Sequence, residues 1–100
     1  MTARIWEGRT KIEHLEAYTT FMKDRAIPDY SKTDGFVKLT FLKRTDTKYA
    51  YFKLITFWKN MEVIKNFAGN DFEKAKYYPE DENYLTDFPE SVIHYEVFAE

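Results

Sequence analysis

Two histidines are the side chains of this sequence best suited to proton transfer near neutral pH. His94 lies in a stretch of alternating polarity, Ser91–Ala99, with Glu96 on the same face two residues later. A histidine enclosed in such a strand can act as a general base and deprotonate a phenol or an enol. The alternative is a core or interface histidine whose ring is simply hydrogen-bonded. His14 lies among acidic residues of an expected helix, and we expect it near the surface.

Large aromatic side chains are the second group with chemical potential. They make up 19% of the chain, with nine Phe, eight Tyr and two Trp. This content gives a small domain a large buried area, and it also suits the wall of a pocket for a flat organic molecule. Trp58 could stack on a planar ligand, or it could anchor a corner between a strand and a helix. Further candidates for such a pocket wall are Trp6, Phe67 and Tyr77.

Cationic side chains at expected strand ends form a third group. Arg9 could pair with an anionic substrate, as could Arg44 and Lys53, although exposed cations of this kind are usually solvated. The sequence has no cysteine, and two histidines with scattered acids give no metal-ligand spacing. It also has no glycine-rich phosphate loop, dinucleotide fingerprint or GxSxG motif. We therefore expect neither a metal nor a bound cofactor.

Charge and hydropathy restrict the partners and the compartment. The net charge is −2 and the isoelectric point is about 5.7, whereas nucleic acids and anionic membranes require a basic surface. We find no signal-peptide pattern and no apolar run long enough to span a bilayer. One hundred residues correspond to a single domain, 1–100. We therefore expect a cytoplasmic protein that binds neither nucleic acid nor a membrane.

Hydrophobic periodicity predicts the elements that must position these residues. Thr2–Thr10 alternates as a first strand, and Lys11–Ile27 carries an apolar stripe typical of a helix. Thr10 and Glu13 have the spacing of a capping box. Pro28 should end this helix, because proline lacks the backbone donor that a helix needs. A polar loop should then lead to the turn signal Asp34-Gly35.

The second half predicts a hairpin, two helices and a last strand. Phe36–Arg44 and Tyr49–Trp58 should pair through a short polar turn, and the second of these strands is apolar on both faces. Asn60 should cap a helix that Gly69 closes, and a short helix should follow from Asn70 or Asp71 to just before Pro79. Pro79–Pro89 is acidic and should be irregular. Ser91–Ala99 should form the last strand.

The resulting order, β-α-β-β-α-β, predicts an α+β fold of the ferredoxin-like type with an antiparallel sheet. Helices cover only one face of such a sheet. Strands that are apolar on both sides therefore predict that the bare face packs on a second copy, as a two-fold homodimer.

Several residue runs resemble those of the antibiotic biosynthesis monooxygenase family. The strand ending at Trp58, the helix with Phe67, and His94-Tyr95-Glu96-Val97 near the end carry part of this resemblance. The remaining runs are Ala68-Gly69-Asn70-Asp71 with Ala75, Arg4-Ile5-Trp6, Gly8-Arg9-Thr10 and Ile27-Pro28-Asp29-Tyr30. Together they span nearly the whole chain. The resemblance implies a dimeric α/β barrel built from ferredoxin-like subunits.

The resemblance also implies two kinds of activity. Some members oxygenate polycyclic aromatic substrates with O₂ and without metal or flavin, whereas others degrade haem with an Asn, a Trp and an axial His. Met1–Thr10 contains no Asn, and Asn60–Asn83 contains neither Trp nor His, which argues against haem. The strand before Trp58 also lacks the Asn of the cofactor-free pattern.

Two functions follow as expectations. The first is a cofactor-independent monooxygenase-like protein that acts on a small aromatic or quinol-type molecule, with His94 as the catalytic base. The second is a non-catalytic dimeric module that binds a small hydrophobic ligand. In both cases Trp58, Trp6, Phe67, Tyr77 and Arg9 are the expected ligand-binding residues.

Overall fold

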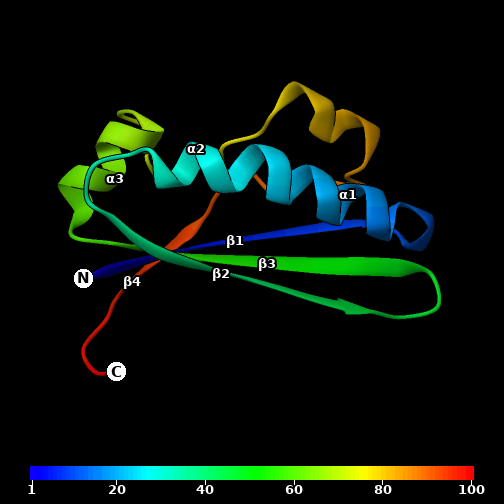
Figure 1. The fold of residues 1–100 in the computed structure, drawn as a ribbon, viewed down its shortest axis with the longest axis horizontal. Helices are drawn as coiled ribbons and strands as arrows, with labels where there is room; N and C mark the ends of the chain where they lie inside the picture. The colour runs from blue at the N-terminus through cyan, green and yellow to red at the C-terminus, as the bar shows by residue number, and fades with distance from the viewer.

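Four strands form one antiparallel sheet in the order β2-β3-β1-β4 in the computed structural model, which describes residues 1–100 (Figure 1). The strands are β1 (Thr2–Lys11), β2 (Phe36–Thr45), β3 (Tyr49–Trp58) and β4 (Ile93–Glu96). β1 and β3 pair along their whole length, whereas β4 pairs only with Thr2–Ile5 of β1. The predicted ferredoxin-like α+β fold is thus confirmed.

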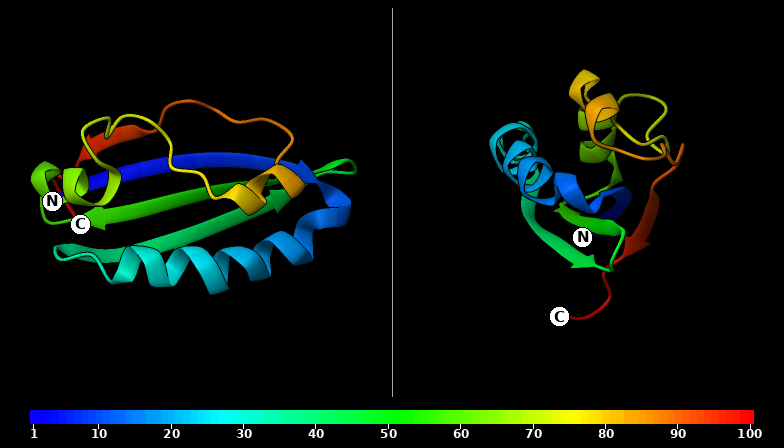
Figure 2. Two further views of the ribbon diagram at one scale, coloured as in Figure 1. Left: turned by 90° about the horizontal axis from the view of Figure 1, so that it is seen from above. Right: turned by 90° about the vertical axis from the view of Figure 1, so that its right-hand side faces the viewer.

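The helical elements all lie on one face of the sheet (Figure 2). A nearly continuous helix runs along the strands as η1 (Ile12–His14), α1 (Leu15–Phe21), η2 (Met22–Ala26) and α2 (Ile27–Ser31). The second half of the chain adds α3 (Met61–Ala68) and a short 3₁₀ helix, η3 (Pro79–Asn83). None of these helices is long and apolar enough to cross a membrane.

The alternation of β3 decides where the core sits. Every second side chain of this strand is buried under the helices, and these are Ala50, Phe52, Leu54, Thr56 and Trp58. The intervening side chains are only partly covered, because a single chain supplies nothing on the other face. Helix residues such as Tyr18, Met22 and Ile64 complete the core. We refer below to the uncovered side of the sheet as the bare face.

Pro28 does not end the first helix, so that prediction was wrong. The turn Met22–Ala26 is π-helical, and the Ile27 N–H bonds to the Met22 carbonyl, five residues back. A π turn inserts one extra residue and shifts the hydrogen-bond register. Pro28 then falls in the first turn of α2, where a residue without an N–H is tolerated. The helix continues to Ser31, into the range predicted as a loop.

Other predicted element boundaries were also wrong, for reasons of tertiary contact. Thr10 does not cap the helix, because it is a buried residue of β1 and its Oγ1 donates to the Lys11 carbonyl. No helix follows Asn70. Instead residues 73–75 run beside residues 90–92, with Ala75 N–H bonding to the Glu90 carbonyl and Val92 N–H to the Glu73 carbonyl.

The last strand is shorter than predicted, because the outer edge of β1 is shared. β4 takes the edge at Thr2–Ile5, whereas the other end of that edge bonds an earlier segment. There Thr86 N–H donates to the Arg9 carbonyl, and Thr10 bridges to Leu85. Strand pairing is therefore limited to Ile93–Glu96 rather than Ser91–Ala99.

Two glycines allow the cost of an unfavourable backbone conformation to be compared with the cost of overpacking. Gly35 and Gly69 both have a positive φ, of 87° and 86°. A Cβ at Gly35 would lie 2.3 Å from Cγ1 of Val63, whereas a Cβ at Gly69 would meet nothing within 4 Å. Gly69 also has a ψ of −170°, a conformation essentially restricted to glycine, so we expect Gly69→Ala to cost about 1–3 kcal/mol of unfolding free energy as conformational strain alone. Gly35→Ala should cost about 1–3 kcal/mol more, because the side chain is also overpacked.

Urea denaturation of the two variants measures this difference, as a larger fall in midpoint for Gly35→Ala at an unchanged slope. Equal losses for the two variants would contradict the packing contribution of Val63.

Candidate functional site

A groove opens between the helical layer and the edge strand β2. Its volume is about 210 Å³. Five hydrophobic side chains and three polar ones line it, namely Met22, Ile27, Phe41, Leu42, Phe52, Thr19, Lys23 and Lys43. An apolar hollow with a few polar groups is the usual form of a small-molecule site.

The π-helical turn contributes directly to this groove. Met22 and Lys23 belong to the turn and line the wall, and Ile27 follows at its end. Single π turns within longer helices occur frequently at functional sites. The sequence predicts an uninterrupted α-helix here, so the π turn is seen only in the structure. Its position at the groove is a structural argument for a functional site.

Two lysines give the groove its electrostatic character. Lys23 and Lys43 form no ion pair, and the Lys43 Nζ makes only a long hydrogen bond of 3.4 Å to the Thr19 Oγ1. Their charges are thus available to an anionic ligand. Sequence reasoning missed both residues. On β2, Lys43 points to the same helix-facing side as Leu39 and Phe41. A cation on that otherwise apolar side is a signal in the sequence that could have identified Lys43.

His94 points to the helical side of the sheet, beside Arg4 of the neighbouring strand. Its Nε2 lies 3.2 Å from the Arg4 Nη1, which requires an unprotonated nitrogen that accepts this hydrogen bond. Burial and the adjacent Arg4 guanidinium both lower the pKa of His94. His94 does not line the groove. A role for His94 as catalytic base therefore stays a prediction.

Arg4 itself is almost completely buried, with 4% of its surface exposed. It has no carboxylate partner. Instead it donates to the backbone carbonyls of Phe72 and Lys74, the latter at 3.0 Å. Burial lowers the pKa of this guanidinium. The Arg4–His94 pair thus attaches the segment after α3 to the sheet.

The predicted aromatic residues form two separate pairs. Trp58 is fully buried, its Nε1 donates to the Thr56 Oγ1 at 2.8 Å, and its ring lies 5.1 Å from Phe67. Trp6 meets Tyr77 edge-on at 6.3 Å. The Trp6 Nε1 is buried without a hydrogen-bond partner. Neither pair lines the groove, so these residues are not brought together in one site.

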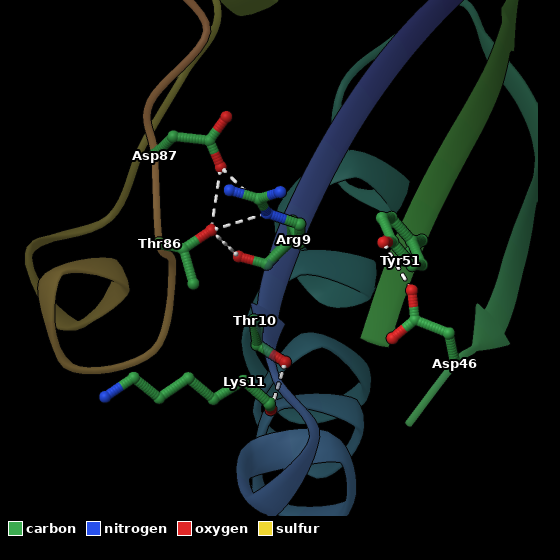
Figure 3. Close-up of polar contacts among 7 residues, drawn as sticks. All are labelled: Arg9, Thr10, Lys11, Asp46, Tyr51, Thr86 and Asp87. Carbon is green, nitrogen blue, oxygen red and sulfur yellow. Dashed lines mark hydrogen bonds and ion pairs between the residues drawn. The ribbon is translucent and has the colours of Figure 1, made fainter. Parts of the chain in front are cut away.

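Arg9 lies near the hairpin end of β1, whereas His94 is level with Arg4 at the other end. Figure 3 shows the polar contacts of Arg9. Its Nε donates to the Thr86 Oγ1 at 2.9 Å and lies 3.8 Å from Asp87. Its guanidinium also lies 4.3 Å from the ring centre of Tyr49. These contacts fasten the loop before β4 to the sheet. The sequence did not foresee them, because Arg9 and Thr86 are 77 positions apart.

Two carboxylates hold the segment between α3 and β4 over the helices. Tyr18 donates its hydroxyl to Asp81 at 2.9 Å, and burial raises the pKa of Asp81. Asp29 accepts from the Tyr78 hydroxyl at 2.7 Å and from Lys76 at 3.0 Å. Burial alone would raise the pKa of Asp29, but these hydrogen bonds lower it to about 2.

The interior beneath this segment is filled by rings. Tyr18 lies 5.0 Å from Phe52 and 5.4 Å from Tyr84, and Phe21 lies 5.9 Å from Tyr84. No cluster of three or more His, Cys, Asp or Glu side chains could hold a metal ion. The groove beside β2 therefore combines apolar walls and free cations in a way that this interior does not.

Comparison with solved structures shows where this fold occurs. A Bacillus cereus protein classed with the antibiotic biosynthesis monooxygenases has a TM-score of 0.69 at 13% identity, over 99% of this chain and 94% of its own. A Nitrosomonas europaea protein of the same class has a TM-score of 0.68 at 15% identity, over 99% of this chain and 100% of its own. No protein-family model and no curated protein sequence matches the chain.

The haem degrader MhuD of Mycobacterium tuberculosis, solved with two haems in its active site, has a TM-score of 0.67. Its identity to this chain is 16%, over 100% of this chain and 98% of its own. The resemblance predicted from the sequence is thus confirmed for the fold over the whole chain. At these identities the likeness concerns the fold alone.

The Arg4–His94 contact predicts a pH dependence of stability. Because the pKa of His94 is lowered in the folded chain, the unfolded chain takes up a proton more readily as the pH falls through the ordinary histidine range, about 6.5. Stability that is present above this range is therefore lost below it, by about 1.4 kcal/mol for each unit of pKa difference. His94→Gln keeps an acceptor for Arg4 and does not titrate.

Chemical denaturation from pH 8 to pH 5 tests this. The wild type should lose more unfolding free energy than His94→Gln as the pH falls, whereas His14→Gln, the control, should follow the wild type. Parallel curves for the wild type and His94→Gln would contradict a lowered pKa of His94 in the folded chain.

Proposed function

We propose that this chain is a cofactor-independent, monooxygenase-like protein that binds a small aromatic or quinol-type anion in the groove beside β2. The observation that carries the proposal is the pairing of apolar walls with two cations that have no ion-pair partner, Lys23 and Lys43. The shared fold with proteins classed as antibiotic biosynthesis monooxygenases supports the same choice.

In the proposed oxidation the substrate supplies the electrons, so the protein needs only to bind it and to stabilise its anion. In an anthrone-type substrate, a methylene beside a phenol becomes a carbonyl. One oxygen atom of O₂ goes to carbon, the other leaves as water, and the substrate supplies all four electrons. Lys23 and Lys43 would stabilise the substrate anion, because a nearby positive charge lowers the pKa of a phenol or enol. Apolar walls would exclude water from the reacting carbon.

Haem fits this groove poorly. Pockets for drug-sized ligands are typically about 300–1,000 Å³, and haem is at least as large as such ligands, whereas the groove measures about 210 Å³. No histidine lines it. We therefore favour a smaller aromatic ligand over the haem of MhuD.

One observation favours a second function, the non-catalytic binding of the same kind of ligand. His94 accepts a hydrogen bond from buried Arg4 and lies away from the groove. The groove thus contains no general base, and proton removal would depend on the cations alone. Binding without turnover is the result that this second function predicts.

The bare face supports a homodimer. The paired side chains Ile5, Ile55 and Ile93 lie on this face, with Phe57 and Tyr95 beside them. Ile93 and Tyr95 are more than half exposed. A contiguous apolar area on a folded chain marks an interaction surface. A two-fold axis would cover this face on both copies at once.

Oxygen consumption with a panel of hydroquinones, naphthols and anthrones tests the first proposal. The wild type should consume O₂ with at least one class. Lys43→Gln should lower kcat/KM by roughly 10-fold, the typical effect of one lost charge-assisted contact. Lys48→Gln, in the exposed hairpin turn, should leave the rate unchanged.

Melting curves recorded with the same panel separate the two functions. Ligand stabilisation without oxygen consumption would replace the first function by the second. Absence of both, or a Soret shift on adding haemin, would overturn the groove assignment.

Light scattering tests the dimer. We expect the mass of two chains for the wild type and of one chain for Ile55→Lys, because a buried charge without a partner is costly at an apolar interface. Thr20→Lys, exposed on α1, should remain a dimer. A monomeric wild type, or a dimeric Ile55→Lys, would rule out the proposed interface.

A further inference from the structure

The two cations of the ligand groove differ in how their side chains are held. Lys23 lies exposed on the π turn. The Lys43 Nζ, in contrast, donates to the Thr19 Oγ1 at 3.4 Å. Thr19 belongs to α1 and Lys43 to β2, two elements that run side by side (Figure 2), and both residues line the groove. The contact between them therefore joins the helical wall of the groove to its strand wall.

The hydroxyl of Thr19 can only accept in this contact. A threonine hydroxyl has one proton to donate and two lone pairs. Its proton is committed to the Leu15 carbonyl at 2.7 Å, because a carbonyl oxygen has no hydrogen of its own. A lysine ammonium, in turn, donates and cannot accept. The lone pairs of the Thr19 Oγ1 are thus left for Lys43.

Thr19 is held more firmly than the lysine that it contacts. Its side chain is bonded to the preceding helical turn at Leu15, and its carbonyl accepts from the Met22 N–H at the start of the π turn. A lysine side chain is a flexible four-carbon chain, and its charged end tends to extend into water. The fixed oxygen of Thr19 therefore restrains the mobile ammonium of Lys43.

The length of this hydrogen bond leaves the ammonium able to serve a ligand. Ordinary N–H···O bonds measure about 2.7–3.2 Å, so the contact at 3.4 Å is a weak one. Thr19 is neutral and does not cancel the charge of Lys43. An ammonium group has three donors, and a single contact with Thr19 leaves the other two for an anionic oxygen.

We propose that Thr19 is a positioning residue, which holds the Lys43 ammonium at the groove so that it meets the anionic oxygen of an aromatic ligand. The inference rests on the proposed ligand groove, and it assigns the contact with the phenolate or enolate oxygen to Lys43. A charge that is in place before the ligand arrives stabilises the anion without the cost of ordering a long side chain. The preference of the groove for anions then depends on the Thr19 hydroxyl.

A purely structural role for Thr19 predicts a different result. Helical threonines can bond the carbonyl four residues back, and this local bond slightly destabilises a helix. If the bond to Leu15 were the whole role of Thr19, loss of the hydroxyl should change stability and leave anion binding intact. Thr19→Val and Thr19→Ser separate the two roles, because valine keeps the branched shape whereas serine keeps the hydroxyl.

Absorbance titration with 4-nitrophenol tests the proposal, because this phenol changes colour when it loses its proton. The wild type should bind the phenolate more tightly than the phenol, so the pKa of the bound probe should fall below that of the free probe. Thr19→Val should weaken phenolate binding by roughly 2- to 10-fold, the effect of one hydrogen bond. The pKa of the bound probe should then rise by up to about one unit. Thr19→Ser should keep the wild-type values.

Two further variants serve as controls. Thr20→Val alters the adjacent, exposed threonine of α1 and should leave binding unchanged, whereas Lys43→Gln should have a larger effect than Thr19→Val. Wild-type binding by Thr19→Val, or equal losses for Thr19→Val and Thr19→Ser, would overturn the positioning role while leaving the groove standing. An unshifted probe pKa in the wild type, or a shift that persists in Lys43→Gln, would overturn the groove cations and this inference together. Because the readout is binding, it applies whether or not the chain consumes O₂.

Discussion

A buried guanidinium without a carboxylate is the constraint on which the second half of this structure depends. Arg4 satisfies its donors with the Phe72 and Lys74 carbonyls and the His94 ring. A charge held out of water requires such partners, because leaving them unpaired is costly. Residues 72–74 must therefore keep their carbonyls free for Arg4, which conflicts with a continued helix. Through the same contact the His94 ring accepts a hydrogen bond from Arg4 and helps to satisfy the buried guanidinium.

Features of the fold that depend on neighbouring residues in the chain could be predicted from the sequence, whereas features set by distant contacts could not. The strand Tyr49–Trp58, the cap at Asn60 and the closure at Gly69 each depend on residues close together in the chain, and each was predicted correctly. The helix expected after Asn70 failed because Arg4, nearly 70 positions away, determines that segment. The helix end expected at Pro28 failed because a π turn shifted the hydrogen-bond register before it.

The candidate site was less predictable, for a related reason. Its residues come from the π turn, from α1 and α2, and from the strands β2 and β3, and no sequence spacing joins them. Trp58 and Trp6 were among the residues predicted to bind a ligand, yet both are buried in the core. A domain with this aromatic content needs its rings for packing. The informative residue was Lys43, a cation on the helix-facing side of an otherwise apolar stripe.

The groove borders the bare face, and this links the proposed ligand site with the proposed dimer. Leu42, Lys43 and Phe52 line both the groove and a second hollow of about 370 Å³ near the β2–β3 hairpin. β2 is the edge strand, so its side chains separate the helix-covered side of the sheet from the bare side. A partner on the bare face would therefore pack on Leu42, whereas the neighbouring Lys43 and Phe52 point to the helix-covered side. The proposed dimer would thus reach the proposed ligand site through Leu42, which would support the wall of the groove from behind.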